Sequence, residues 1–490
     1  MSIVATAPVL VPLATAGLTA MVAGRTRLQQ AVSFAGALGF LAAAVALMAQ
    51  VSAGVPASVS FGDWALPYGI QFQLDGLSSV LVLVTALMGL ASLLYLASDA
   101  DPGPRHPLLL PLVHGTLTGV AGAFSTADLF NLYVWFEVML ICALGLIALG
   151  GRRDQLDAAF KYLGLNLFGT LLLLSAIGLL YAATGQLNYG ALAVAARQID
   201  PPLLHALLVT LAVALLLKSA AFPLYAWLPA SYPTLPAPVL ALFAGLLTKV
   251  GAYAVLRTLG DVFMPAGAAL FEALGWVAAA TMVAGVLGAA YHWDLRRILA
   301  FHIVSQIGYI LLAVALGGPG GHAAALFYTV HHIVVKANLF LIAGMIAALA
   351  GAYDLRHIGG LAAARPALAV LFAVPALSLV GIPPLSGFWA KLLVLQETLA
   401  QQRFAWGAIA LLVSMLTLYS MMKIWLEAFW KRHPGDGGSE AFATWQPRRV
   451  ALAPAWMATC GLAAVTLAIG LAPHALIELA RDAADALGRR

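Results

Sequence analysis

Residues 215–229 read LLLKSAAFPLYAWLP and place Lys218 five residues before a proline in the middle of an apolar stretch. Pro223 has no N–H and clashes with the carbonyl group four residues earlier, so a helix is predicted to break just after Lys218. Inside a membrane, a broken helix is tolerated only where protein buries it or where it lines a wet cavity. The stretch therefore predicts a membrane helix interrupted at an internal polar site. The alternative is a lysine whose long side chain reaches the membrane surface.

The composition of the whole chain agrees with a membrane location. Of its 490 residues, 62% are hydrophobic and only 9% are charged, whereas soluble domains carry roughly 25% charged residues. This excludes a soluble enzyme, because so few ions would not cover a globular surface in water. The basic residues lie in short loops rather than in a run, so the net charge of +5 does not indicate nucleic-acid binding.

The predicted fold is an all-α polytopic membrane protein that forms one membrane domain over residues 1–490. About 20 apolar residues cross a bilayer core of roughly 30 Å, and the sequence contains about 14 such stretches. They cover residues 3–21, 31–51, 77–97, 107–124, 129–149, 162–184, 203–221, 236–259, 267–291, 298–316, 323–349, 366–399, 406–430 and 450–471.

The Lys and Arg residues predict how these helices are oriented. With the N-terminus outside, fifteen of the 25 fall on the cytoplasmic side and six on the outer side, as the positive-inside rule requires. An even number of crossings then places both termini outside. The inner residues are Arg25, Arg27, Arg105, Arg152, Arg153, Lys161, Arg296, Arg297, Arg356, Arg365, Lys423, Lys431, Arg432, Arg448 and Arg449. The outer residues are Arg197, Arg257, Arg403, Arg481, Arg489 and Arg490.

The remaining four basic residues are lysines inside predicted membrane helices: Lys218, Lys249, Lys336 and Lys391. Only one acid, Glu137 in FNLYVWFEVMLI (residues 130–141), lies at the middle of such a helix. A charge at the bilayer centre costs about 2.5 to 3.5 kcal/mol, so charged residues there usually mark ion pathways. We predict that these five residues carry protons. The alternatives are a protonated structural acid at Glu137 and a structural bond from Lys249 to a carbonyl group.

Glu137 and Lys218 are predicted to form a pair. Burial favours the neutral form of a lysine, and a nearby carboxylate favours the charged form. Forming or breaking the pair would therefore control whether Lys218 holds its proton.

A related break occurs in LSLVGIPPLSGFWAKLLVLQ, residues 377–396, where Pro383 and Pro384 precede Lys391. Two Pro-broken helices, each with a lysine beside the break and set five helices apart, are typical of an internal repeat around an ion site. The lysine precedes the break in one copy and follows it in the other, an order that inverted repeats accommodate.

Between the two breaks, FYTVHHIVVKANLF (residues 327–340) places Tyr328, His332 and Lys336 four residues apart, on one helical face. All three exchange protons, so we predict a proton relay; a hydrogen-bonded core cluster is the alternative. His331 points about 100° away, which makes the two histidines a poor metal site. We include it in the predicted pathway as a neighbour of the relay.

No sequence signal indicates a cofactor or a metal. The chain has no P-loop, no dinucleotide fingerprint, no H-E-x-x-H and no CxxC. Its last part, residues 473–490, is predicted to be an amphipathic tail that lies at the membrane interface or docks to a partner.

Five segments together resemble the antiporter-like subunits shared by complex I, membrane hydrogenases and Mrp-type cation/proton antiporters. These segments are FNLYVWFEVMLI, KSAAFPLYAWLP, GLLTKVGAY, HHIVVKANLFLIAG and GIPPLSGFWAK. The residues of the first and fourth segments, together with the length of the chain, are most similar to those of the D-type subunits of the multisubunit Mrp Na+/H+ antiporters.

The resemblance implies fourteen helices with inverted five-helix repeats over residues 107–260 and 267–430. It also implies that Glu137 and Lys218 form the paired site, that Lys249 and His332 relay protons, and that Lys391 is the terminal lysine. Complex I members often have a histidine where this chain has Tyr328, so the relay differs at that position.

Two functions follow from the resemblance. In the first, the chain is not an enzyme but the proton-translocating subunit of a multisubunit Na+/H+ antiporter in a bacterial cytoplasmic (inner) membrane. Its partners would then be a large antiporter-like subunit, several small membrane subunits, lipid, protons and Na+. In the second, the chain is a proton-pumping arm of a complex I-like quinone reductase or a membrane hydrogenase. The buried row of charges is common to both.

Overall fold

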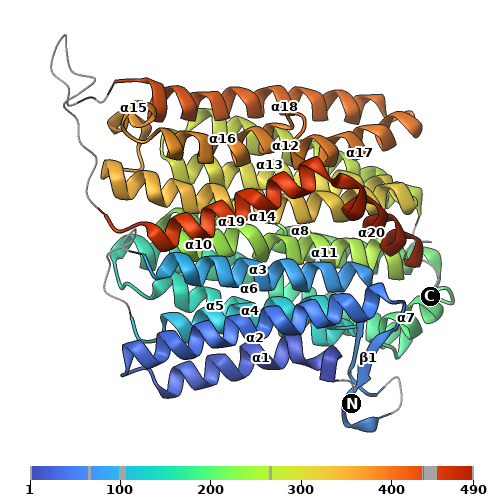
Figure 1. Cartoon of the computed structure of the whole chain (residues 1–490). Coiled ribbons are helices and arrows are strands. Elements are labelled where there is room, and N and C mark those ends of the chain that lie inside the picture. The colour runs from blue at the N-terminus through green and yellow to red at the C-terminus, as the bar shows by residue number, and fades with distance from the viewer. Residues whose placement is uncertain are drawn as a thin grey trace.

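A computed structural model describes residues 3–64, 68–98, 106–263, 267–432, 434 and 450–487. Long helices run roughly parallel to one another and stack side by side across the molecule (Figure 1). The helices are α1 (Ile3–Met21), α2 (Thr26–Ser52), α3 (Gly76–Leu96), α4 (Leu109–Ser125), α5 (Leu129–Ala148), α6 (Arg153–Thr184), α7 (Tyr189–Ala196), α8 (Pro201–Lys218), α9 (Trp227–Ser231), α10 (Ala237–Leu242), α11 (Thr248–Val255), α12 (Ala268–Tyr291), α13 (Leu295–Leu316), α14 (Gly318–Ala350), α15 (Leu361–Ala364), α16 (Pro366–Val380), α17 (Ser386–Ala400), α18 (Phe404–Trp425), α19 (Ala453–Leu471) and α20 (Pro473–Ala486).

The all-α polytopic membrane fold is confirmed. Among the described residues, twelve helical segments are long and apolar enough to cross a membrane, and one of them, Ala237–Val262, joins α10, α11 and two π-helical turns. The shorter apolar helices α4 and α16 occupy the other two predicted stretches. The number of crossings in the bilayer remains a prediction.

Burial is distributed as expected for a bundle in lipid. The 33-residue helix α14 lies near the centre of the stack (Figure 1) and is buried along most of its length. By contrast, α18 leaves Leu411, Leu412, Met415 and Tyr419 more than half exposed. An apolar side chain costs nothing in contact with lipid tails, so this face is suited to the membrane.

The helices are interrupted at both predicted proline sites. Helix α8 ends at Lys218, and α9 begins at Trp227 beyond Pro223. In the second case α16 ends at Val380 and α17 begins after the two prolines. Gly381 ends α16 with φ of +97°, a conformation that a side chain disfavours.

The same short connection occurs at the start of two long helices. Asp128 caps α5, and its backbone forms an antiparallel β-bridge with Asn188. Asp294 caps α13, and its backbone forms the same kind of bridge with Asp354. Two backbone hydrogen bonds of 2.8 to 3.0 Å flank each pair. Each connection therefore ties the start of one helix to the loop that follows the next long helix.

Two smaller elements complete the fold. Strands β1 (Ala57–Ser60) and β2 (Gln71–Leu74) form an antiparallel hairpin at one end of the bundle. Within the predicted tail 473–490, α20 buries Ala480, Ala483 and Ala484, and it packs on α14 and α3.

Some of the sequence predictions fall on residues outside the described part of the chain. They are Arg105, Arg448, Arg449, Arg489 and Arg490.

Candidate functional site

Glu137 and Lys218 lie on either side of a third residue, Thr170. Lys218 Nζ donates a hydrogen bond of 2.7 Å to Thr170 Oγ1, and this hydroxyl donates one of 2.7 Å to Glu137 Oε1. The three side chains come from α8, α6 and α5. The predicted pair is therefore bridged by a hydroxyl group instead of joined directly, and a hydroxyl can accept and donate a proton in the same step.

The ammonium group of Lys218 has two further neighbours. It donates to the carbonyl oxygen of Asn166 at 3.1 Å and lies 5.7 Å from the centre of the Phe136 ring. Lys218 is only 6% exposed. It is the last residue of α8, because Pro223 prevents the helix from continuing past Ser219.

Lys249 lies on the next helical segment, directly after a π-helical turn at Phe243–Leu247. Its Nζ donates to the carbonyl oxygen of Ala244, within that turn. A Cβ at Gly251 would lie 2.7 Å from the Ser219 nitrogen, so the helix of Lys249 touches the end of α8 beside Lys218. The close approach brings the first two lysines of the row onto contacting helices.

His332 on α14 is fully buried, and neither ring nitrogen has a hydrogen-bond partner among the described residues. It is within electrostatic reach of Lys249, Lys336 and His331. The hydroxyl of Tyr328, one turn earlier, donates a hydrogen bond of 2.6 Å to Gln306 Oε1. Buried polar atoms without partners are costly, so a histidine in this position indicates a role other than stability.

Lys336 and Lys391 both donate to carbonyl oxygens. Lys336 Nζ donates to Leu299 at 3.3 Å, and Lys391 Nζ donates to Val380 at 2.7 Å, at the end of α16. Lys391 also lies 5.2 Å from the Tyr309 ring centre. At the second broken helix the lysine thus bonds to a carbonyl group at the end of α16, whereas Lys218 bonds to a carbonyl group in the middle of α6.

His331 faces the second break. Its Nδ1 forms a 2.8 Å hydrogen bond with Ser386 Oγ at the start of α17, and Ser386 lies 3.0 Å from Ser378 Oγ at the end of α16. It is within electrostatic reach of Lys391 and Lys336. His331, which points away from the face of Tyr328, His332 and Lys336, thus lies between that face and Lys391.

Sequence reasoning missed several polar residues beside the row. His302, Gln306 and Tyr309 lie on one stretch of α13, and Thr170 lies on α6. His302 Nε2 hydrogen-bonds to Ser420 Oγ at 2.8 Å and is within electrostatic reach of Lys336 and Lys391. The available signal was the spacing of these three residues, three to four apart inside an apolar helix.

The predicted position of Arg257 in an outer loop is wrong. Arg257 lies inside the membrane segment Ala237–Val262 and is 1% exposed. Its guanidinium donates to Asp75 at 2.8 and 2.9 Å and to Asp261 at 3.3 Å. Two carboxylates offset the cost of burying this charge, and one of them, Asp75, is distant in sequence.

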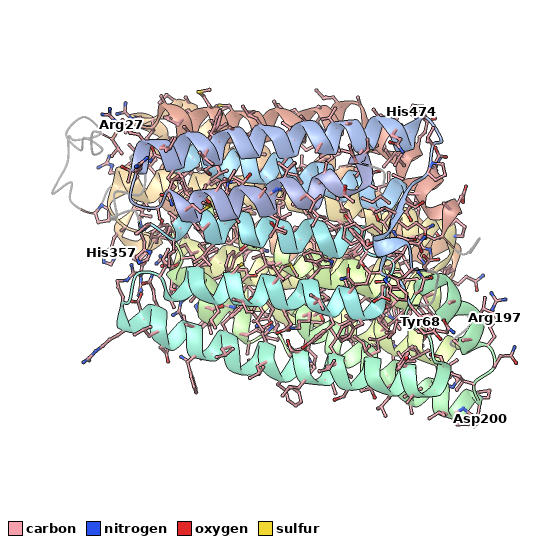
Figure 2. All side chains as sticks on the ribbon, turned by 90° about the horizontal axis from the view of Figure 1, so that it is seen from below. Arg27, Tyr68, Arg197, Asp200, His357 and His474 are labelled. Atoms are coloured by element: carbon pink, nitrogen blue, oxygen red, sulfur yellow. The ribbon has the colours of Figure 1, made fainter. Side chains whose placement is uncertain are left out.

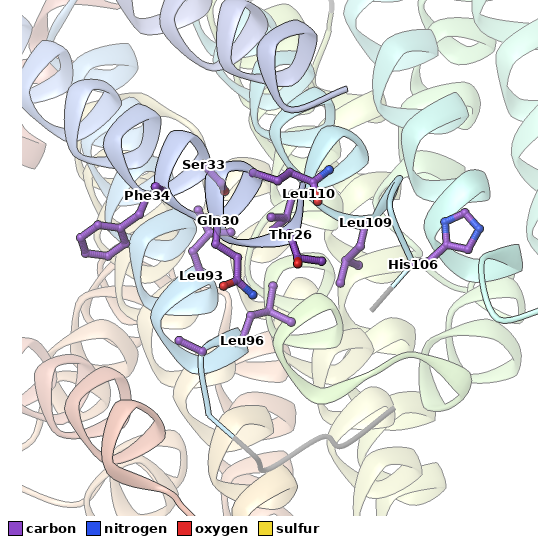
Figure 3. Close-up of a pocket in the computed structure, with 12 residues that line it drawn as sticks. Thr26, Gln30, Ser33, Phe34, Leu93, Leu96, His106, Leu109 and Leu110 are labelled. Atoms are coloured by element: carbon purple, nitrogen blue, oxygen red, sulfur yellow. The ribbon is translucent and has the colours of Figure 1, made fainter. Parts of the chain in front are cut away.

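A separate pocket lies away from this row. It has a volume of about 270 Å³ and is lined by the ends of α2, α3 and α4, including Gln30, Phe34, Leu96 and His106 (Figure 3). None of Glu137, Lys218, Lys249, Lys336 and Lys391 lines it. Among the described residues, no group of three or more His, Cys, Asp or Glu residues is arranged to hold a metal ion.

Comparison with known proteins identifies the family. A family profile described as NADH:quinone oxidoreductase/Mrp antiporter, transmembrane, matches residues 126–421. The chain is 35% identical over 479 residues to the D-type subunit of the Na(+)/H(+) antiporter of Alkalihalophilus pseudofirmus, covering 98% of this chain and 96% of the relative. A chain in the structure of the Mrp complex from Dietzia sp. DQ12-45-1b superposes with a TM-score of 0.91 and 37% identity, covering 100% of this chain and 98% of that chain.

A chain of respiratory complex I from Thermus thermophilus has the same fold. Its TM-score is 0.84 at 26% identity, and the superposition covers 99% of this chain and 100% of that chain. Both sequence identity and structural similarity are therefore higher for the Mrp complex than for this complex I chain.

Proposed function

Because the chain belongs to the NADH:quinone oxidoreductase/Mrp antiporter family of membrane proteins, we propose that it is the proton-translocating subunit of a multisubunit Na+/H+ antiporter. The observation that carries this proposal is the nearly end-to-end similarity to an antiporter subunit of the D type. A transporter subunit of this kind is a component of a secondary transport complex and not an enzyme.

The buried row supplies the proton path. Glu137, Thr170 and Lys218 form its first part, where a shift of the Thr170 hydroxyl would change how the carboxylate influences the lysine. The row continues along contacting helices, from the segment Ala237–Val262 to the relay of α14 and on to α16 and α17 at the second break. The residues to which we assign proton transfer are Glu137, Lys218, Lys249, Tyr328, His331, His332, Lys336 and Lys391.

The two halves of the row belong to two inverted repeats, over residues 107–260 and 267–430. Matching connections at Asp128 and Asp294, and a lysine beside each break, support this assignment. Inversion explains why one lysine ends a helix and the other follows a break. Each repeat would then supply one half-channel to the shared row.

The complex resides in the bacterial cytoplasmic membrane, with both termini of this chain outside. Arg27 and His357 lie at one end of the bundle, and Tyr68, Arg197, Asp200 and His474 lie at the other (Figure 2). We assign the first end to the cytoplasm, following the positive-inside rule. An impermeant maleimide applied to intact cells should label Asp200→Cys but not Arg27→Cys; the reverse result would invert the topology.

The partner set decides between the two candidate functions. Tagged chain, solubilised in mild detergent from its host, should co-purify with a large antiporter-like subunit and several small membrane subunits. Co-purification with iron–sulfur or flavin proteins would instead support a redox-driven pump, the function that the fold shared with complex I favours as the alternative.

Transport is tested on the complete complex in everted membrane vesicles. Adding Na+ should collapse a preformed pH gradient, and Glu137→Gln should abolish the collapse at normal complex levels. Wild-type rates in this variant would overturn the proposed role of the row.

A further inference from the structure

A stripe of polar residues leads from the central row toward the outer surface. Lys249, Tyr253, Arg257 and Asp261 are spaced four residues apart, which places them on one face of the segment Ala237–Val262. All four are at most 7% exposed. Twelve residues of helix extend about 18 Å, so the stripe connects the level of Lys249 with the outer end of the helix.

The outer half of the stripe is a connected cluster. Arg257 Nε donates to the hydroxyl of Tyr253 at 3.2 Å, and its Nη atoms donate to Asp75 and Asp261. The hydroxyl of Ser78 accepts a further bond at 3.2 Å. One guanidinium thus lies between two carboxylates, so these three groups carry one net negative charge when all are ionised.

The stripe is interrupted on its inner side. Lys249 Nζ donates to the carbonyl group of Ala244, five residues earlier, away from Tyr253. The hydroxyl of Tyr253 instead donates to the carbonyl group of Phe124 at 3.3 Å. In this conformation, no hydrogen bond between described residues links the central lysine to the outer cluster.

His322 on α14 lies directly beside the cluster. A Cβ at Gly260 would be 3.0 Å from His322 Nε2, and His322 is within electrostatic reach of Asp261. The side chain is 3% exposed, and its Nε2 has no hydrogen-bond partner among the residues described. This ring nitrogen therefore has a hydrogen-bonding position left over, next to the cluster, that can take part in proton transfer.

His322 also lines a pocket at the outer surface. It lines a pocket of about 410 Å³ together with Gly317, Glu272, Gln401 and Arg403, at the ends of α12, α13 and α17. The pocket therefore lies between the surface and a ring that approaches Gly260, the residue before Asp261.

Other charged groups lie around His322. Glu272 and Arg403 pair at 2.6 Å across the pocket, and Glu397 lies against Gly320 on the same helix as the histidine. The charged residues of α20, which packs on α14, are exposed: Glu478, Arg481, Asp482 and Asp485. Asp261 is the buried carboxylate within electrostatic reach of the ring.

We propose that Asp261 and His322 form an outer proton-transfer site between the stripe and the surface pocket, and that Arg257 is its barrier. The cluster as a whole attracts a proton to Asp261, but the guanidinium of Arg257 lies between Asp261 and Tyr253 and does not give up its own proton, so the proton stops at this point. A proton passes only when Lys249 turns outward toward Tyr253. This proposal rests on the proposed antiporter function, because it assigns a path to the same proton.

The test compares His322→Gln and Asp261→Asn with His474→Gln in the complete complex. His474 is a matched control because it is an exposed histidine at the same end of the bundle, with 82% of its side chain accessible. Na+-driven collapse of the pH gradient is measured in everted vesicles at several pH values of the lumen, which corresponds to the outer face, and is normalised to assembled complex. We expect both site variants to be roughly tenfold slower and to lose their dependence on lumenal pH, whereas the control follows wild type.

Two further results make the outcome decisive. Asp261→Glu retains a carboxylate and should recover part of the rate and the pH dependence; equal behaviour of Asp261→Glu and Asp261→Asn would overturn the proposal even if His322→Gln failed to assemble. Wild-type pH profiles in both site variants, with Glu137→Gln inactive, would overturn the outer site and leave the proposed function intact. An active Glu137→Gln would instead contradict the proposed function.

Discussion

One hydroxyl group bridges Lys218 and Glu137: Thr170 Oγ1 accepts a hydrogen bond from the lysine and donates one to the carboxylate, each of 2.7 Å. A direct ion pair in a membrane would hold both charges tightly. A bridging hydroxyl holds them apart yet coupled, since rotation of one O–H bond alters both contacts.

Thr170→Val removes this hydroxyl while keeping the shape of the side chain. The loss of a hydrogen bond to a charged group costs about 1.5 to 3 kcal/mol, so we expect Na+/H+ exchange to slow by roughly 10- to 100-fold. Thr170→Ser, which keeps the hydroxyl, should stay within about twofold to threefold of wild type. Equal rates for the two variants in everted vesicles would show that the bridge has no part in transport.

His332→Phe separates transport from stability. Because neither ring nitrogen of His332 has a partner in the described structure, an apolar ring of similar size should leave the melting temperature unchanged or raise it. Proton-coupled transport should nevertheless be lost, since phenylalanine does not exchange protons. Thermal unfolding in detergent and vesicle transport measure the two effects. A lower melting temperature together with normal transport would indicate a structural histidine.

Gly381→Ala tests the end of the second broken helix. A Cβ at this position would lie 2.9 Å from Lys391 Cδ, and the φ of +97° is itself unfavourable for alanine. We expect a stability loss of about 1 to 2 kcal/mol and a displaced Lys391, hence slower exchange. Gly461→Ala is the control, because no atom lies within 4 Å of its added Cβ. Matching thermal stability and exchange rates for the two variants would contradict this account.

Asp128 caps α5 just outside its membrane segment, and its burial raises the pKa of the carboxyl group, an effect that hydrogen bonds from the Asn131 and Phe130 backbone partly oppose. Between the ordinary pKa and this raised one, the folded state binds more protons than the unfolded state, so stability falls as the pH rises.

Asp128→Asn keeps the cap without the charge. Its melting temperature, relative to wild type, should therefore increase from pH 4 to pH 7. Asp128→Ala should be about 1 kcal/mol less stable than Asp128→Asn at both values, because the cap is gone. If the melting temperatures of Asp128→Asn and wild type depended on pH in the same way, the buried charge would not destabilise the fold.

Much of the site could be predicted from local sequence. The buried lysines and Glu137 stand out because a charge in an apolar stretch is expensive, and the breaks stand out because proline does not continue a helix. Spacing alone places Tyr328, His332 and Lys336 on one face of α14.

Contacts between distant segments could not be predicted in this way. Thr170 is 48 residues from Lys218 in sequence, and a threonine in an apolar helix is unremarkable until the fold brings it between two charges. The counter-ion of Arg257, Asp75, lies 182 residues earlier; without that partner, an arginine near a helix end is expected at the surface.

Hydrophobicity and helix periodicity are properties of neighbouring residues, so the linear chain is enough to specify a lipid solvent, a helical class and the residues that must carry charge inside the membrane. Folding then settles which charges are bridged, which histidine nitrogens lack partners among the described residues, and that His322 approaches Gly260, beside the ion pair of Arg257 and Asp261. These relationships are distances of a few ångströms between helices, and packing of the whole bundle sets them.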